Sequence, residues 1–256
     1  MSKWNPTQYN RFRAERQQPF FDLLALVRPR AQMRVVDLGC GTGEMTSVLH
    51  QRLEAAETLG LDNAATMLAD STAHHTAGLH FTLGEIGAFE APAAYDLVFS
   101  NAALHWLPHH AGLFARLTDA LRAGGQLAVQ MPYNFDQPSH TVAAAVADET
   151  PFRAALGGFR VERPVEAPDW YAALLYRLGY QEQHVRLQVY GHVLTKRDDV
   201  IEWVKGTLLT AYEQRLPADL WPQFMTRYRA ALLAELDDAQ PYFYPFKRLL
   251  LWGRRP

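Results

Sequence analysis

The sequence is poor in cysteine: Cys40 is the only one among 256 residues. A single cysteine cannot form a disulfide within the chain, and it excludes a cysteine-rich metal site. Nothing in the composition therefore requires an oxidising compartment, and we expect the protein in the cytoplasm.

Long apolar runs and a one-sided charge are also missing. No apolar stretch approaches the roughly 20 residues that a membrane-spanning helix needs, and the N-terminal MSKWNPTQYNRFRAERQQ has no apolar signal core. The charged residues, 25 basic and 27 acidic, give a net charge of −2, which argues against a nucleic-acid partner. The composition, 48% hydrophobic and 20% charged, is that of an ordinary globular protein, and the length fits one domain, residues 1–256, with a lid.

Strand and helix patterns alternate in residues 31–132. The expected strands are RVVDLG, ETLGLD, LHFTLGEI, YDLVFS and QLAVQMP. The expected helices are TSVLHQRL, AATMLADSTAHH and HAGLFARLTDALRAGG, the last one ended by glycine. This alternation predicts an α/β fold with a parallel sheet and helices on both faces, doubly wound through right-handed crossovers.

The regions on either side of this core have a different pattern. Residues 1–30 predict two N-terminal helices, the second at about 19–27, and residues about 133–167 and 195–241 predict helical insertions. Between and after the insertions we expect a helix in DWYAALLYRLGY and strands in HVRLQVYGHVL and YFYPFKRLLLWGRR. An aromatic stripe in the second insertion should mostly pack as core: Trp203, Tyr212, Trp221, Phe224 and Tyr228.

The stretch VVDLGCGTGEM, residues 35–45, joins the first strand to a helix through three glycines. Such a corner binds ligands, because glycine adopts positive φ and lets a ligand approach the backbone. The dinucleotide fingerprint G-x-G-x-x-G/A has a small sixth residue, and here Glu44 takes that place. Its carboxylate would repel a pyrophosphate, so the turn favours a ligand without phosphates, and S-adenosylmethionine is one.

The ends of the later strands carry matching polar residues. Asp62, 19 residues after Gly43, can accept hydrogen bonds from both ribose hydroxyls, although a strand-end acid can also be merely solvated. Glu85 can accept from the adenine amino group, and the N–H of Ile86 can donate to a ring nitrogen. Asn101 ends the fourth strand and would face the middle of the cofactor.

Four of these stretches, VVDLGCGTGEMT, LGLDNAATML, GEI and YDLVFSNAALHWL, resemble the class I S-adenosylmethionine-dependent methyltransferases over about half the chain. With WNPTQYNRFRAERQQPFFDLLALV, NAALHWLPHH and YPFKRLLLWGRR added, nearly the full length is similar to the trans-aconitate 2-methyltransferase family. The resemblance implies a Rossmann-like, mostly parallel seven-stranded sheet whose helical insertions form a lid. It also implies S-adenosyl-L-methionine as cofactor, S-adenosyl-L-homocysteine as product, and no metal.

The resemblance further implies the site residues. The cofactor-binding set is Tyr9, Asp37, Gly39, Cys40, Gly41, Asp62, Asn63, Met67, Glu85, Ile86 and Asn101. The substrate-binding set is His105, Trp106, Trp203, Tyr244 and Arg248. The family often has glutamine where this chain has His105.

A carboxylate acceptor is ionised at neutral pH, with an ordinary pKa near ~4, so no catalytic residue is expected beyond groups that position the reactants. Cations should hold the acceptor's carboxylates, and Arg248 is favoured because a guanidinium binds them with two parallel hydrogen bonds. Lys247 lies on the opposite face of the expected strand. Lys205 and Arg16 are the other candidates.

The function expected is therefore O-methylation of a carboxylate of a small polycarboxylic acid, most simply trans-aconitate. The alternatives are another class I carboxyl methyltransferase, acting on a different small molecule or a carrier protein, and a cofactor-binding protein without turnover. We expect neither nucleic acid nor membrane as partner, and the oligomeric state stays open.

Cys40 should be a small buried side chain, and the pairs 74–75 and 109–110 should be surface histidines and not metal ligands.

Overall fold

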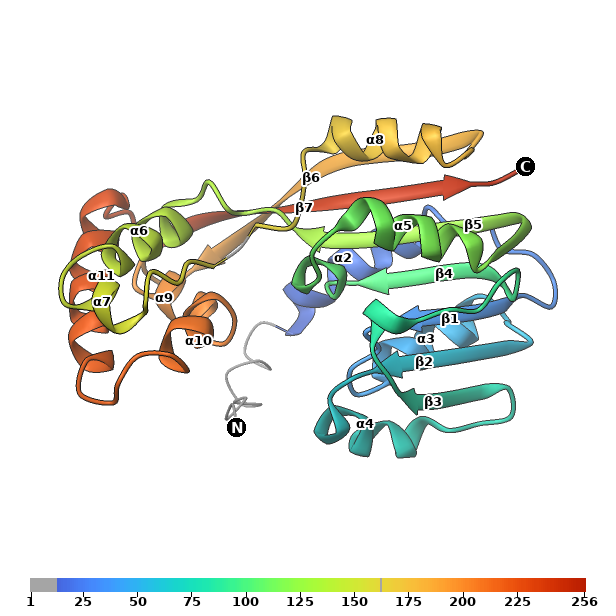
Figure 1. Cartoon of the computed structure of the whole chain (residues 1–256), viewed down its shortest axis with the longest axis horizontal. Coiled ribbons are helices and arrows are strands. Elements are labelled where there is room, and N and C mark those ends of the chain that lie inside the picture. The colour runs from blue at the N-terminus through green and yellow to red at the C-terminus, as the bar shows by residue number, and fades with distance from the viewer. Residues whose placement is uncertain (1–12, 162) are drawn as a thin grey trace. The chain divides into compact units, whose positions relative to one another are not determined.

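The computed structural model of the chain describes residues 13–161 and 163–256 (Figure 1). The strands are β1 (Arg34–Leu38), β2 (Glu57–Asp62), β3 (Leu79–Leu83), β4 (Tyr95–Asn101), β5 (Leu121–Pro132), β6 (Glu182–Leu194) and β7 (Tyr242–Arg254). The helices that connect or cover these strands are α2 (Arg13–Leu24), α3 (Glu44–Arg52), α4 (Ala65–Ser71), α5 (His110–Asp119) and α8 (Pro168–Arg177), with the short 3₁₀ helices η1 (Thr72–His74), η2 (Ile86–Ala88) and η3 (Leu104–Trp106). The remaining helices are α6 (Pro138–Ala147), α7 (Phe152–Ala155), α9 (Asp199–Lys205), α10 (Leu208–Glu213) and α11 (Trp221–Glu235).

The seven strands form one sheet in the order β3-β2-β1-β4-β5-β7-β6. Strands β1 to β5 pair in parallel, and β7 runs antiparallel to β5. The doubly wound, mostly parallel seven-stranded fold is confirmed. The strand order reverses between β1 and β4, and open α/β sheets bind ligands at the carboxyl ends of the strands beside such a reversal.

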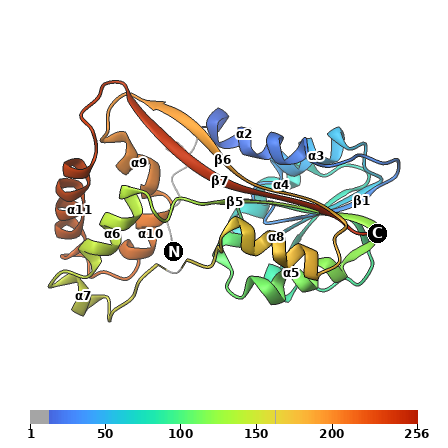
Figure 2. The ribbon, with the colours of Figure 1, turned by 90° about the horizontal axis from the view of Figure 1, so that it is seen from above.

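Helices cover both faces of the sheet, with α2 and α3 on one side and α5 and α8 on the other (Figure 2). On the first side Phe20, Leu23 and Leu49 pack against sheet residues such as Phe99 and Trp252. Each of these side chains is at most 2% exposed, and full burial of such a side chain contributes about 1.5–3 kcal/mol. This packing makes the sheet a rigid support for the loops at its edge.

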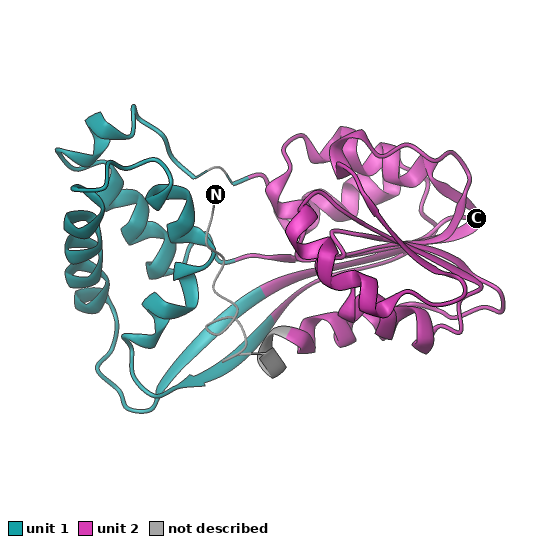
Figure 3. Cartoon of the chain, turned by 90° about the horizontal axis from the view of Figure 1, so that it is seen from below, with its two compact units in different colours: residues 1–15, 134–163, 189–247 teal, residues 16–133, 164–188, 248–256 magenta. Residues whose placement is uncertain are grey.

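The chain divides into two compact units (Figure 3). One contains the sheet core: residues 16–133, 164–188 and 248–256. The other, which we call the helical unit, contains residues 1–15, 134–163 and 189–247, and so includes most of both expected insertions.

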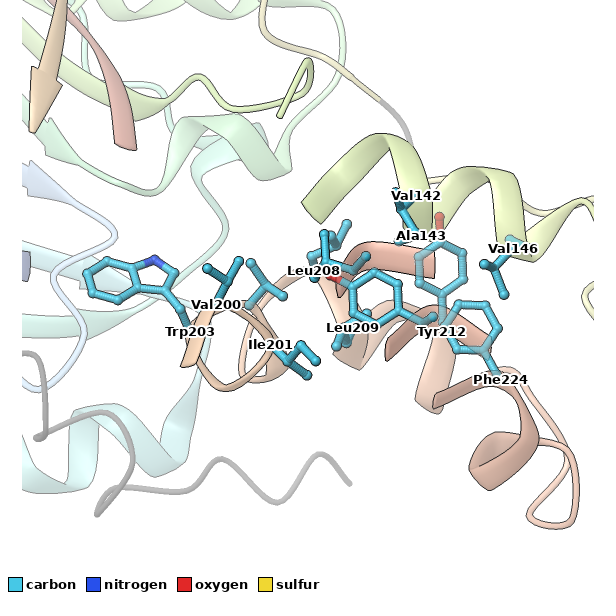
Figure 4. Close-up of a cluster of buried hydrophobic side chains, with 14 of the residues drawn as sticks. Val142, Ala143, Val146, Val200, Ile201, Trp203, Leu208, Leu209, Tyr212 and Phe224 are labelled. Atoms are coloured by element: carbon cyan, nitrogen blue, oxygen red, sulfur yellow. The ribbon is translucent and has the colours of Figure 1, made fainter. Parts of the chain in front are cut away.

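The helical unit has its own apolar core, shown in Figure 4. Most of the aromatic stripe packs there, as expected: Trp203, Tyr212, Phe224 and Tyr228 are buried. The rings of Tyr212 and Phe224 stack with centroids 5.3 Å apart. This unit is therefore held together by apolar side chains from α6, α9, α10 and α11.

Two expected boundaries are wrong. The helix after β4 ends at Asp119, not at a glycine, and β5 begins at Leu121, because Leu121 is buried and pairs with Tyr95. The second N-terminal helix begins before Pro19: α2 runs from Arg13 to Leu24 with Pro19 inside it. A proline there removes one backbone hydrogen bond, and the burial of Phe20 and Leu23 on the same helix offsets that loss.

Candidate functional site

The turn after β1 is held in a conformation that glycine adopts freely. Gly39, Gly41 and Gly43 have φ of 84°, 58° and 76°. The N–H groups of Gly39 and Cys40 both donate to the carbonyl of Leu61, at 2.7 and 3.1 Å. The turn is thereby fastened to the end of β2, the neighbouring strand.

The glycines of this turn differ in the space around them. A Cβ on Gly39 would lie 2.2 Å from the Cβ of Ala103, so close packing excludes any side chain there. A Cβ on Gly41 would meet only the methyl carbon of Met67, at 3.4 Å. The backbone at Gly41 is therefore accessible to a ligand.

Asp62, at the end of β2, fixes the turn from the side. One carboxylate oxygen accepts from the N–H of Gly41 at 2.8 Å, and the other accepts from the N–H of Ala64 at 2.9 Å. Each oxygen keeps a further lone pair, so the carboxylate can still accept from a diol such as a ribose. Asp62 is thus both a support of the turn and a candidate ligand contact.

Asn63 and Glu85 connect the ends of β2 and β3. The amide nitrogen of Asn63 lies 3.3 and 3.2 Å from the two carboxylate oxygens of Glu85. Glu85 directly precedes η2, whose first residue is Ile86. The Glu85 carboxylate and the Ile86 N–H, which we expect to bind the adenine, are therefore adjacent in one short connection that Asn63 holds in place.

Asp37 is buried within β1, and the hydroxyl of Thr46 donates to it at 2.6 Å. Its pKa is raised to about 7: burial is the main cause, the hydrogen bond from Thr46 opposes it, and the charge of Asp62 adds to it. A cation bound nearby would favour the ionised form. Burial, together with both acids, also raises the pKa of the Cys40 thiol, which therefore stays protonated and is not a nucleophile.

The turn after β4 carries the residues expected on the acceptor side. Asn101 ends the strand, and its buried side-chain oxygen has no hydrogen-bond partner. The Nδ1 atom of His105 also has none, and burial, followed by the charge of Arg248, lowers the pKa of His105 to about 3. Trp106 is 63% exposed and so is not a core residue. At neutral pH His105 is therefore an uncharged polar group.

His110 is buried, so the expectation of a surface residue is wrong for it; His109 is exposed. Nε2 donates to the carbonyl of Leu104 at 3.1 Å, because a carbonyl can only accept. Nδ1 then accepts from the hydroxyl of Tyr171, which itself accepts from the N–H of Glu166 at 3.2 Å. This chain of hydrogen bonds holds η3 in place, and no sequence pattern indicates the long-range contact to Tyr171.

The structure places two of the expected substrate residues inside the helical unit. Trp203 and Tyr244 are buried, with ring centroids 5.9 Å apart. The hydroxyl of Tyr244 lies 3.4 Å from that of Ser139. Their role in substrate binding stays a prediction, as does that of Tyr9, which lies outside the described residues.

The basic candidates have different surroundings. Arg248 is buried on β7, in the unit that contains the sheet core. Lys247 forms an ion pair with Asp136, and Lys205 lies 3.5 Å from Glu202. Of these three cations, Arg248 shares its unit with His105 and Asn101.

Sequence reasoning missed Gln130 on β5, which is 1% exposed. Neither its amide nitrogen nor its amide oxygen has a hydrogen-bond partner, and it pairs in register with Asn101. A polar residue near the end of a parallel strand was a usable signal. Nothing else in the apolar stretch QLAVQMP distinguishes this glutamine from a structural one.

Within the described residues, no group of three or more histidine, cysteine, aspartate or glutamate side chains could hold a metal ion. Over the same residues, no helix is both long and apolar enough to cross a membrane.

The family model described as "Methyltransferase domain" matches residues 29–167, more than half of the chain, so the chain is a member of that methyltransferase family. A trans-aconitate 2-methyltransferase of Deinococcus radiodurans is 44% identical over 259 residues, covering 99% of this chain and 98% of the relative. One from Mycobacterium sp. (strain KMS) is 40% identical, covering 98% and 99%. Within the methyltransferases, the chain belongs to the trans-aconitate 2-methyltransferase family, which confirms the resemblance seen in the sequence.

Solved structures agree on the fold. The YcgJ protein of Bacillus subtilis superposes with a TM-score of 0.63 at 16% identity, covering 93% of this chain and 98% of that one. At this identity the likeness shows the fold alone.

Proposed function

We propose that this chain transfers the methyl group of S-adenosylmethionine to a carboxylate of trans-aconitate and releases S-adenosylhomocysteine and a monomethyl ester. The choice of trans-aconitate as acceptor rests on one observation: the chain is related over its full length to enzymes named for this reaction, at up to 44% identity among those compared. The cofactor proposal is supported by the open backbone at Gly41 beside Asp62 and by the acidic surroundings.

Three acids belong to three strands that are neighbours in the sheet: Asp37 lies on β1, Asp62 ends β2, and Glu85 follows β3 by two residues. Carboxylates repel phosphates and attract cations. They therefore suit a ligand that has a sulfonium and an ammonium and whose ribose and adenine offer hydrogen-bond donors. A dinucleotide would bring its pyrophosphate against Glu44, in the first turn of α3.

The methyl transfer itself needs little acid–base chemistry. An ionised carboxylate oxygen attacks the methyl carbon, the S–C bond breaks, and its electron pair stays on sulfur as a neutral thioether. No proton moves. The protein contributes orientation and exclusion of water, and it holds the other carboxylates of the acceptor.

Arg248 is proposed to hold one of the acceptor's non-reacting carboxylates, and neutral His105 and Trp106 to line the acceptor's approach. Support comes from the burial of Arg248 and from its electrostatic effect on His105. Water exclusion strengthens the attraction between a guanidinium and a carboxylate.

The test is methyl transfer from labelled S-adenosylmethionine to a panel of small mono-, di- and tricarboxylates. We expect the highest kcat/KM on trans-aconitate and a product that releases methanol in base, as an ester does. A base-stable product would point to another acceptor atom. Transfer only to an acylated carrier protein would favour the carrier-protein alternative, and cofactor binding without any transfer would favour a non-catalytic protein.

A further inference from the structure

The amide of Gln130 is the starting observation. It is almost completely buried on β5, and neither its nitrogen nor its oxygen makes a hydrogen bond. Buried polar groups in proteins are nearly always paired, so an amide left unpaired at both ends needs an explanation.

Gln126, four residues earlier on the same strand, shows what a structural glutamine does in this sheet. Its oxygen accepts from the N–H of Arg28 at 2.9 Å and from the indole N–H of Trp252 at 3.0 Å. Its nitrogen donates to the carbonyl of Arg28 at 2.8 Å. Both glutamines are 1% exposed and point to the same face, because strand residues four apart do so. The contrast shows that Gln130 does not serve the fold as Gln126 does.

The surroundings of Gln130 indicate a ligand. It pairs in register with Asn101, at the carboxyl end of β4, whose side-chain oxygen also lacks a partner. On its other side it pairs with Leu250 of β7, two residues from Arg248, which pairs with Pro132. Side chains paired in register share a face, so Asn101, Gln130 and Arg248 all lie on one face of the sheet at its ligand-binding edge.

An amide with two unsatisfied ends fits a place between an anion and a cation. Its N–H group donates to an anion, and its carbonyl dipole points its negative end at a positive charge. In the proposed reaction these two charges are the attacking carboxylate and the sulfonium.

A neutral donor also suits the attacking oxygen better than a guanidinium does. A charged donor would hold the electron pair of the carboxylate more strongly and so lower its reactivity, whereas an amide orients it at a smaller electrostatic cost. An acidic side chain in this position would repel the acceptor.

We propose that Gln130 binds the reacting carboxylate of the acceptor through its amide N–H, with its carbonyl oxygen directed at the sulfonium. This inference rests on the proposed function and adds an acceptor-binding residue to it: Gln130 holds the carboxylate that is methylated, and Arg248 holds another one.

The experiment compares Gln130→Leu with the matched control Gln126→Leu in the full-length protein. The ligand-free melting temperature, the Kd for S-adenosylhomocysteine, and kcat and KM on trans-aconitate are measured for each. For Gln130→Leu we expect a melting temperature equal to or above that of the wild type, a Kd within about twofold, and kcat/KM lower by about 100-fold or more. For Gln126→Leu we expect the opposite: a lower melting temperature, and kcat/KM within a few-fold in the folded enzyme.

The variant Gln130→Glu adds a second measurement, the pH dependence of kcat/KM, which would not change if Gln130 had only a structural role. The glutamate repels the acceptor when ionised and donates through its O–H when protonated, so kcat/KM relative to the wild type should rise as the pH falls. Three results overturn the inference alone, provided the wild type is active: normal kcat/KM in Gln130→Leu, a loss of stability there equal to that of Gln126→Leu, or a pH-independent ratio for Gln130→Glu. A wild type that methylates no carboxylate overturns the proposed function and this inference together.

Discussion

Asp62 is the residue for which a structural role and a ligand-binding role are most clearly combined. Its two oxygens already accept from the N–H groups of Gly41 and Ala64, and they can also accept from a ribose. We predict that Asp62→Ala weakens binding of S-adenosylhomocysteine by about 2–3 kcal/mol, since two hydrogen bonds to a charged acceptor are lost. Because Asp62 also holds two backbone N–H groups of the turn, we predict a lower melting temperature as well. Calorimetry and thermal unfolding measure the two effects. An unchanged affinity would mean that Asp62 supports the turn and touches no ligand.

Asp37 should make stability depend on pH. Burial raises its pKa to about 7 in the folded chain, whereas an unfolded aspartate has its ordinary value of 3.8. Between these two values the folded state binds a proton that the unfolded state has lost. Stability therefore falls as pH rises from about 4 to 7, by roughly 1 kcal/mol per pH unit from this residue.

The variant Asp37→Asn cannot titrate and so isolates this effect. We predict that urea unfolding of the ligand-free protein shows the wild type losing stability relative to Asp37→Asn between pH 5 and pH 7. A stability difference that is constant across this range would show that Asp37 stays ionised in the fold.

At the scale of elements, the glycine turn offers a test with an internal control. Gly41 and Gly157 have nearly equal φ, 58° and 59°, so alanine at either position carries the same backbone strain. A Cβ on Gly157 meets nothing within 4 Å, and one on Gly41 meets only Met67. We predict a similar loss of stability, about 1–2 kcal/mol, in Gly41→Ala and Gly157→Ala, but a cofactor affinity lowered at least tenfold in the first alone. Equal cofactor affinities would show that no ligand approaches the backbone at Gly41.

How much of these elements the sequence predicts depends on the range of the contacts that define them. The turn and the residues at the ends of β2, β3 and β4 follow from local patterns, because a parallel sheet brings successive strand ends to one edge. Gln130 and His110 could not be assigned in this way. An unpaired amide and a bond to Tyr171, 61 residues away, exist only once distant segments have packed. The start of β5 was missed for the same reason, since pairing with Tyr95 overrides the helical pattern of LTDALRAGG.

At the scale of the whole molecule, a net charge of −2 would not attract an acceptor with several carboxylates. Recognition of such an anion must then come from individual cations within the site and not from the overall field. The chain passes from one compact unit to the other between Lys247 and Arg248. Arg248 is buried, whereas Lys247 is only partly buried and forms an ion pair with Asp136. They therefore allow local recognition to be separated from total charge.

Arg248→Ala and Lys247→Ala change the net charge equally, from −2 to −3, so a dependence on overall charge alone would affect both variants alike. Lys247 points to the opposite face of β7, where it pairs with Asp136, and we expect its removal to leave kcat/KM within a few-fold. For Arg248→Ala we predict a loss of about 2–4 kcal/mol in transition-state binding of trans-aconitate. Arg248→Lys should lie between this variant and the wild type, because it keeps the charge but loses the two-pronged geometry.

The size of the Arg248 effect should also follow the number of carboxylates in the acceptor. A monocarboxylate has no second anionic group for the guanidinium, so wild type and Arg248→Ala should methylate it at similarly low rates. Affinity for S-adenosylhomocysteine should barely change in any of the three variants, which calorimetry checks alongside the kinetics. If Arg248→Ala kept full activity on the tricarboxylate, another cation would hold the acceptor, and Lys205 and Arg16 would be tested next. If it lost activity equally on mono- and tricarboxylates, Arg248 would act by maintaining the buried end of β7 and not by binding a second carboxylate.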